Sequence, residues 1–214
     1  MSLAGLFEKT SLKTNTEEIS VLEKYAELIL KWNSTRNLVS RNTNKEQINE
    51  HIFDCACITP LLDENKILDV GTGAGLPGIV VSILESKKKV TLLEPNQKKV
   101  SFLTHVQAEL GLTNLKIEKG RVEDLKKIKE EIIMTRAVME PEKFLASLSK
   151  LREKKFKIIM MVSEPKSDLG PDWKVKYVVS EAQNLLQKKR GFLNITNNKN
   201  CLLYTSDAAD ETER

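Results

Sequence analysis

The most informative stretch of this chain, residues 67–78, reads Ile67-Leu68-Asp69-Val70-Gly71-Thr72-Gly73-Ala74-Gly75-Leu76-Pro77-Gly78. A short apolar run ends in an acid, and four glycines follow within eight residues. Because glycine loses more conformational entropy on folding than other residues, this density indicates a sharp turn that comes close to a ligand. The apolar residues 79–84 then predict a helix. A strand, a glycine turn and a helix start together predict a cofactor-binding site.

The turn is compatible with two kinds of cofactor. Residues 73–78 match G-x-G-x-x-G, the dinucleotide fingerprint, but that match alone is weak. Glu94 ends the next predicted strand, where an acid binds ribose hydroxyls. Both NAD and S-adenosyl-L-methionine carry such hydroxyls, so Glu94 does not separate them.

Three features favour S-adenosyl-L-methionine. Residues 69–75 have the acid-x-G-x-G-x-G form of many methyltransferases. A pyrophosphate needs backbone N–H groups at a regular helix start, and Pro77 interrupts that start without an N–H to donate. Helical sequence precedes the first strand, whereas dinucleotide domains usually open on it. A nicotinamide oxidoreductase remains the alternative from a different class.

From residue 66 onward, predicted strands alternate with predicted helices. The strands are 67–70, 90–93, 115–118, 132–134, 156–162, 174–179 and 191–196, and the helices are 76–84, 97–110, 122–128 and one starting at Pro141. Repeated β-α units predict a mostly parallel sheet with helices on both faces. The short connection between the last two strands predicts an antiparallel edge pair.

The chain divides into three predicted parts. Residues 1–65 form a helical extension, and residues 66–200 form the cofactor-binding domain. Residues 201–214 form a tail, small and polar from residue 206 onward, that we expect to be disordered and not native. In the extension, apolar spacing predicts a helix over residues 21–32 that ends at Asn33-Ser34. A polar loop over 36–44 and a second helix carrying Ile48, Ile52 and Cys55 follow.

Composition narrows the class of protein. With 214 residues, 40% of them hydrophobic and 30% charged, the chain suits one soluble domain with a small extension. We find no bilayer-spanning apolar run, no signal peptide and no metal-ligand spacing, so we expect a cytoplasmic protein that uses neither membrane nor metal. The net charge of +4 permits a nucleic-acid partner without requiring one.

A second block of sequence resembles a known family. It comprises Trp32-Asn33, Asn37-Leu38-Val39-Ser40 and His51-Ile52-x-Asp54, and the glycine turn follows it. Together they resemble the RsmG family, also called glucose-inhibited division protein B, from about residue 21 to about residue 200. The resemblance implies a bacterial enzyme with the Rossmann-like, seven-stranded fold of S-adenosylmethionine-dependent methyltransferases. Its implied reaction is methyl transfer to N(7) of a guanine in the 530 loop of 16S ribosomal RNA, in the small ribosomal subunit. A methyltransferase that acts on another RNA or on a small molecule remains the alternative.

The resemblance also implies which residues bind the cofactor. They are Gly71, Leu76, Glu94, Pro95, Asn96, Val122, Glu123 and Arg136, to which the turn itself adds Asp69 and Gly73. Two positions depart from the family pattern. Glu94 stands where aspartate is common, and residues 161–166 replace a usual Lys-Gly pair, which leaves Lys166 as a weak substitute.

We expect no catalytic side chain and a monomer. Guanine N(7) carries an in-plane lone pair and no proton, so it needs no general base, and catalysis is mainly alignment. Several residues keep two interpretations. Asp69 binds the donor or stabilises its own turn; Glu123 contacts adenine or complements a helix dipole; Arg136 binds the donor carboxylate or an RNA phosphate, or forms a structural ion pair.

The N-terminal block has structural interpretations beside its functional ones. His51 and Asp54 lie on one helix face, where a structural pair is favoured over a catalytic one. Trp32 suits the core better than base stacking. Residues Arg36, Asn37, Ser40 and Arg41 form a polar loop that either faces RNA or is held by local hydrogen bonds.

Overall fold

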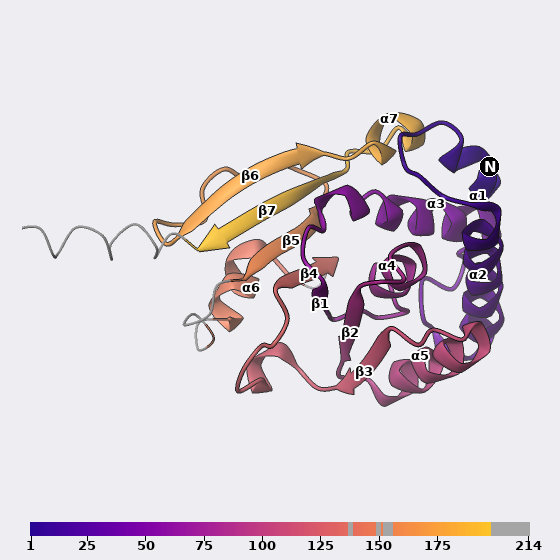
Figure 1. Ribbon diagram of the computed structural model, residues 1–214, viewed down its shortest axis with the longest axis horizontal. Helices are drawn as coiled ribbons and strands as arrows, with labels where there is room; N and C mark the ends of the chain where they lie inside the picture. Colours follow the sequence, from indigo (N-terminus) through magenta and orange to yellow (C-terminus); the bar gives the residue numbers. More distant parts are fainter. Residues whose placement is uncertain (137–138, 149–150, 152–155, 198–214) are drawn as a thin grey trace, which may run out of the picture.

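The computed structural model describes residues 1–136, 139–148, 151 and 156–197. At its centre is a seven-stranded sheet with the order β3-β2-β1-β4-β5-β7-β6 (Figure 1). The strands are β1 (Lys66–Val70), β2 (Lys89–Glu94), β3 (Leu115–Lys119), β4 (Ile132–Arg136), β5 (Lys157–Val162), β6 (Trp173–Val179) and β7 (Gly191–Asn197). Strands β1 to β5 are parallel, whereas β7 is antiparallel to both β5 and β6. The predicted α/β fold with an antiparallel edge is confirmed.

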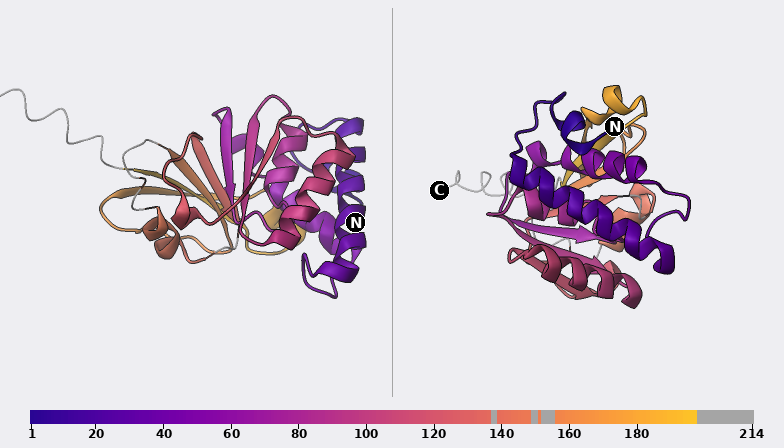
Figure 2. Two further views of the ribbon diagram at one scale, coloured as in Figure 1. Left: turned by 90° about the horizontal axis from the view of Figure 1, so that it is seen from below. Right: turned by 90° about the vertical axis from the view of Figure 1, so that its right-hand side faces the viewer.

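Helices cover both faces of this sheet. One buried cluster joins the sheet to α1 (Leu3–Phe7), α2 (Thr16–Arg36), α3 (Lys45–Ala56), α4 (Gly78–Leu84), α5 (Gln97–Leu110) and α7 (Ala182–Leu186). A second cluster joins the other face to α6 (Pro141–Ser147). Figures 1 and 2 show α2 and α5 at one end of the molecule and α6 at the other. Two short 3₁₀ turns, η1 (Thr59–Leu61) and η2 (Val122–Asp124), complete the described elements.

Helix α2 is longer than predicted at both ends. It starts at Thr16 because Asn15 and Glu18 form a capping box, in which each side chain accepts from the other residue's backbone N–H. It passes Asn33-Ser34 and ends at Arg36, where Asn37 takes the left-handed conformation with φ of 49°. The side chain of Asn33 holds the following loop by bonds to Val39 and Ser40.

Two predicted helices are shorter in the structure. The helix predicted over 76–84 begins only at Gly78, because the Leu76-Pro77 segment belongs to the turn before it. The helix predicted over 122–128 is only η2, since Leu125 returns to an extended conformation.

The N-terminal helices share their core with the sheet. Leu22 of α2 and Ile52 of α3 are fully buried in the same cluster as Ile67 of β1 and Leu92 of β2. The division at residue 65 stays a prediction, and the tail 201–214 lies outside the described residues. Within those residues, no helix combines the length and apolarity that a membrane crossing requires.

Candidate cofactor-binding site

The glycine turn is fixed to the neighbouring strand. Gly71 donates its backbone N–H to the carbonyl oxygen of Leu93 on β2 at 2.8 Å. Gly71, Gly73 and Gly75 have φ of 67°, 62° and 95°, which favours glycine at all three positions. The turn therefore lies at the carboxyl ends of β1 and β2, where ligands bind in open α/β sheets.

The glycines of the turn have different surroundings. A Cβ atom on Gly75 would lie 2.4 Å from Ile79 Cδ1, and one on Gly78 would lie 2.1 Å from Leu92 Cδ2. Both positions are thus closed by the protein's own packing. A Cβ on Gly73 would meet nothing nearer than 3.9 Å, so the open space of the turn lies beside Gly73.

Asp69 binds its own turn. Its Oδ2 accepts from the Gly78 N–H at 2.8 Å and from the Thr72 hydroxyl at 2.5 Å, and the residue is fully buried. Its Oδ1 has no partner among the described residues. Burial raises the pKa of Asp69 to about 7, although the bonds from Thr72 and Gly78 oppose this rise. This geometry favours the interpretation that Asp69 stabilises the turn.

Glu94 joins the turn to the end of β2. Its Oε2 accepts from the Gly73 N–H and its Oε1 from the Asn96 N–H, both at 2.9 Å, and only 4% of the residue is exposed. The carboxylate is held beside the open space at Gly73. Each oxygen can accept one further hydrogen bond, and a ribose hydroxyl is a suitable donor.

The predicted site residues lie along one edge of the sheet. Residues 71–76 follow β1, residues 94–96 end and follow β2, Val122 and Glu123 form η2 after β3, and Arg136 ends β4. Because the sheet order is β3-β2-β1-β4, these positions form one continuous row. Leu76 and Val122 are buried, whereas Pro95, Asn96 and Glu123 are exposed.

Helix α3 supports the arginine at the end of β4. Arg136 Nη2 lies 2.9 Å from His51 Nδ1, and Arg136 Nη1 donates to Cys55 Sγ at 3.7 Å. Since arginine only donates, His51 Nδ1 must accept, and the imidazole is neutral. Burial and the Arg136 charge lower the pKa of His51 to about 4.

His51 and Asp54 do not orient each other. Asp54, only 3% exposed, instead accepts from Arg190 Nε at 3.1 Å. Its second oxygen has no partner among the described residues, and burial raises its pKa. The two residues of the sequence pair thus hold two different arginines, Arg136 on β4 and Arg190 just before β7.

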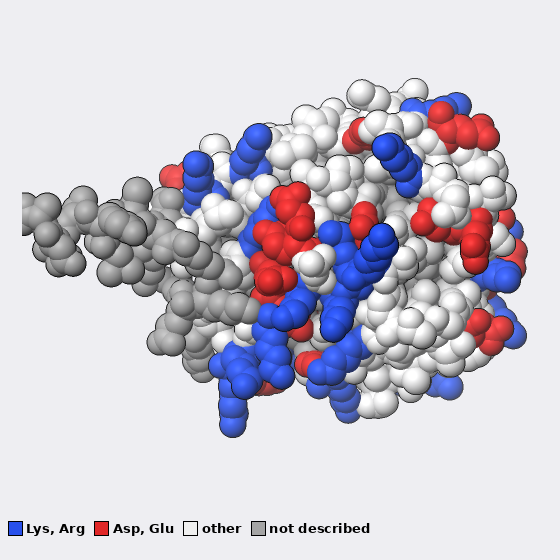
Figure 3. Space-filling view, viewed as in Figure 1, with Lys and Arg blue, Asp and Glu red and all other residues white. Residues whose placement is uncertain are grey.

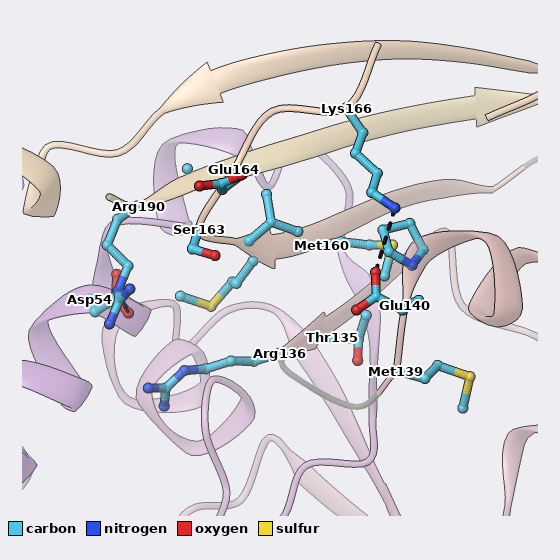
Figure 4. A pocket seen from close by; sticks show the side chains of 14 residues that line it. Asp54, Thr135, Arg136, Met139, Glu140, Met160, Ser163, Glu164, Lys166 and Arg190 are labelled. Atoms are coloured by element: carbon cyan, nitrogen blue, oxygen red, sulfur yellow. Dashed lines mark hydrogen bonds and ion pairs between the residues drawn. The ribbon is translucent and has the colours of Figure 1, made fainter. Parts of the chain in front are cut away.

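A cavity of about 530 Å³ opens beside Arg136, at the carboxyl ends of β4 and β5. Figure 4 shows Arg136, Arg190 and Asp54 on one side, with Lys166 and Glu140 on the other. Lys166 pairs with Glu142 at 2.7 Å and with Glu140 at 3.5 Å. Methionines 139, 160 and 161 supply adaptable apolar surface. The cavity thus combines polar groups with surface that suits a flat ring.

The N-terminal block contributes mainly support. Trp32 packs on the rings of Phe102 and His105, with centroids 5.4 and 5.2 Å away. Asn37 accepts from Arg41 Nε at 3.0 Å, so the polar loop is held by local hydrogen bonds. Arg36, Ser40 and Arg41 are exposed on this loop.

Sequence reasoning missed two contacts of the site. Tyr25 of α2 donates its hydroxyl to the Ala74 carbonyl oxygen at 2.7 Å and is fully buried. Burial raises the pKa of Tyr25 well above its usual value. Tyr25 is 49 residues from its partner Ala74, and Arg190 is 136 residues from its partner Asp54. No local sequence pattern predicts contacts over such separations.

Most of the chain matches a known protein family. The family described as rRNA small subunit methyltransferase G matches residues 18–191. Ribosomal RNA small subunit methyltransferase G of Nitrosomonas europaea is 45% identical over 148 residues, covering 68% of this chain and 69% of the relative. The protein of that name from Nitrosomonas eutropha is 35% identical over 195 residues, covering 87% and 91%.

A solved structure shares the fold. A mutant of MtNAS in complex with S-adenosylmethionine superposes with a TM-score of 0.56, covering 91% of this chain and 88% of that one. Sequence identity is 11%, so this likeness concerns the fold alone.

Proposed function

Because the chain belongs to the rRNA small subunit methyltransferase G family, we propose that it methylates 16S ribosomal RNA, with S-adenosyl-L-methionine as the donor. The proposed target is N(7) of a guanine in the 530 loop. The observation that carries the donor assignment is the Glu94 carboxylate, buried and bonded to Gly73 beside the open part of the turn.

The residues present fit this donor. Gly73 leaves space, whereas Gly75 and Gly78 are closed by packing. Glu94 offers acceptors for the ribose hydroxyls, and the buried side chains of Leu76 and Val122 offer apolar contacts. Gly71, Pro95, Asn96 and Glu123 complete the proposed donor site, while Asp69 acts by holding the turn. The pyrophosphate of a nicotinamide dinucleotide would lack regular N–H donors at the helix start, because residues 76 and 77 precede α4.

The chain's own contribution to the reaction is alignment. When bound, S-adenosyl-L-methionine supplies an electrophilic methyl group on its sulfonium sulfur. The glycine turn and Glu94 fix the donor, and Arg136 binds its carboxylate or a phosphate of the RNA. Holding the two reactants in line contributes up to roughly 7–11 kcal/mol, without any proton transfer by a side chain.

We propose that the 530 Å³ cavity receives the guanine. It adjoins Arg136, so a ring in the cavity lies next to the donor row. Its methionines contact the faces of the ring, and its polar groups contact the edges. The enzyme acts in the cytoplasm as a monomer in this proposal.

Methyl transfer from labelled donor to undermethylated small subunits and to their stripped RNA tests the proposal. We expect label in the RNA of at least one of the two substrates, and binding of S-adenosyl-L-methionine but not of NADH by isothermal titration calorimetry. Binding of NADH alone would overturn the donor assignment. If label appears only in transfer RNA or in a small molecule offered in parallel, the proposed substrate is wrong.

A further inference from the structure

A second cavity, of about 520 Å³, lies at the edge of the sheet opposite the glycine turn. It is formed where β1, β2 and β3 begin. Six lysines and one glutamate line it: Lys66, Lys87, Lys88, Lys89, Lys116, Lys129 and Glu130. We call this cavity the lysine groove.

The lysines of the groove follow the order of the strands. Lys66 and Lys89 are the first residues of β1 and β2, and they are paired in register. Lys116 is the second residue of β3, the next strand in the sheet. Neighbouring strands lie about 4.8 Å apart, so Lys66 and Lys89 begin side by side. Lys116 is paired with Thr91, two residues further along β2 than Lys89. Like charges on paired strand positions destabilise a sheet, so sheet stability does not account for the pairing of Lys66 with Lys89.

Three of the groove lysines have no ion-pair partner among the residues that the structure describes. Lys66, Lys87 and Lys89 are exposed, and the ion pairs found within the described part of the chain involve none of the three. Lys88 differs, because its Nζ donates to the carbonyl oxygens of Leu62 and Glu64. Lys66, Lys87 and Lys89 are therefore available to an external anion.

The groove is preformed. The Asn114 side chain donates to the carbonyl oxygens of Ser82 at 3.0 Å and Lys88 at 3.1 Å, and it accepts from the Ser82 hydroxyl at 2.8 Å. Lys89 donates its backbone N–H to Asn65 at 2.8 Å. In Figure 3, Lys and Arg side chains gather from the centre to the lower edge, where Figure 1 places β2 and β3.

We propose that the lysine groove binds the phosphate backbone of RNA outside the methylated loop. This inference rests on the proposed RNA substrate. Lysine ammonium groups bind phosphates as point charges and release counterions on binding. The other described lining residues are small polar or aliphatic, which offers no ring for base stacking. The groove is thus suited to the backbone, without reading sequence.

The position of the groove indicates a large RNA. Strand β1 has five residues and spans about 16 Å, so the groove and the glycine turn lie on opposite edges of the sheet. One RNA that contacts both must extend around the protein, as a folded ribosomal RNA or subunit can and a short oligonucleotide cannot.

Salt-dependent RNA binding tests the inference. The test variant is Lys66→Gln/Lys87→Gln/Lys89→Gln. The matched control is Lys13→Gln/Lys24→Gln/Lys31→Gln, three exposed lysines elsewhere. With labelled 16S ribosomal RNA, we expect the groove variant to lower the slope of log Kd against log salt by about 2–3, at about 0.7–0.9 per phosphate contact. We expect at least tenfold weaker binding at low salt, while donor affinity and the control stay at wild-type values.

The outcomes separate the two proposals. A groove variant with the slope and affinity of the wild type overturns the groove inference, even if the wild type methylates ribosomal RNA. Weaker binding to subunits with unchanged binding to naked RNA also overturns it and indicates an acidic protein instead. Absence of methyl transfer by the wild-type protein overturns the proposed function, whatever the groove binds.

Discussion

Gly73 and Gly111 adopt nearly the same left-handed backbone, with φ of 62° and 65°. A Cβ atom at either position meets no atom nearer than 3.9 Å. Alanine at each should therefore cost a similar amount of stability, about 1–2 kcal/mol, from backbone strain alone. Only Gly73 lies beside the proposed donor space. We expect Gly73→Ala to weaken binding of S-adenosyl-L-methionine at least tenfold, and Gly111→Ala to leave it unchanged.

Denaturant unfolding and isothermal titration calorimetry check both halves of this comparison. Equal donor affinity in the two variants would show that the space at Gly73 is not used by the donor.

Glu94 places a buried carboxylate beside the open space at Gly73. Glu94→Gln keeps one acceptor oxygen, so its NH₂ group must face the backbone N–H of either Gly73 or Asn96. The negative charge of the acceptor is also lost. Hydrogen bonds to charged groups contribute about 1.5–3 kcal/mol, so donor affinity should fall about 10- to 100-fold. Glu109→Gln, on the exposed surface of α5, serves as control. Calorimetric affinities within twofold of each other would refute the role of Glu94.

His51 makes stability depend on pH. Its pKa is lowered to about 4 in the folded protein, so the unfolded chain binds more protons between pH 4 and 6.5. The contribution of His51 to stability therefore rises with pH across this window and is lost on acidification, by up to about 1.4 kcal/mol per pH unit. The raised pKa of Asp69 contributes in the opposite direction, so the comparison with a His51 variant isolates the histidine. His51→Gln keeps a neutral acceptor for Arg136. We expect a flatter dependence in unfolding experiments between pH 4.5 and 6.5; an unchanged slope would contradict the assignment.

At the scale of elements, the Tyr25 side chain connects α2 to the glycine turn by a hydrogen bond. The Tyr25 hydroxyl donates to Ala74 inside the core, so its removal leaves a buried carbonyl without that donor. We expect Tyr25→Phe to cost about 1–3 kcal/mol of stability and to weaken donor binding. Tyr177→Phe, on strand β6 at the far edge of the sheet, should change neither property appreciably. Thermal unfolding and donor titration of both variants measure this. A Tyr25→Phe variant with the stability and donor affinity of the wild type would show that this contact of α2 does not support the site.

The elements were predictable where local chemistry defines them. Helix α5 begins and ends as predicted, because Asn96 caps its first turn and Gly111 takes the left-handed conformation after its last residue. The start of α2 was missed although the Asn15 and Glu18 pair is a local capping signal. Helix α4 starts late because the Leu76-Pro77 segment belongs to the turn, which apolar spacing does not reveal.

For the whole molecule, the row of site residues was predictable from strand ends and resemblance. Parallel strands bring their carboxyl ends to one edge, so Gly71, Glu94 and Arg136 were expected together. What holds them was not predictable. The contacts of Glu94 with Gly73, of Arg136 with His51 and of Tyr25 with Ala74 connect residues 21, 85 and 49 positions apart. Such pairings depend on packing across the whole fold.

N(7)-selective strand cleavage of 16S ribosomal RNA tests the central claim most directly. Undermethylated small subunits, or the RNA stripped from them, are incubated with the protein and S-adenosyl-L-methionine, and the cleaved RNA is mapped. Our account predicts one new cleavage at a guanine in the 530 loop, reduced in parallel with donor affinity by Glu94→Gln. Absence of cleavage in that loop, despite a bound donor, would contradict it.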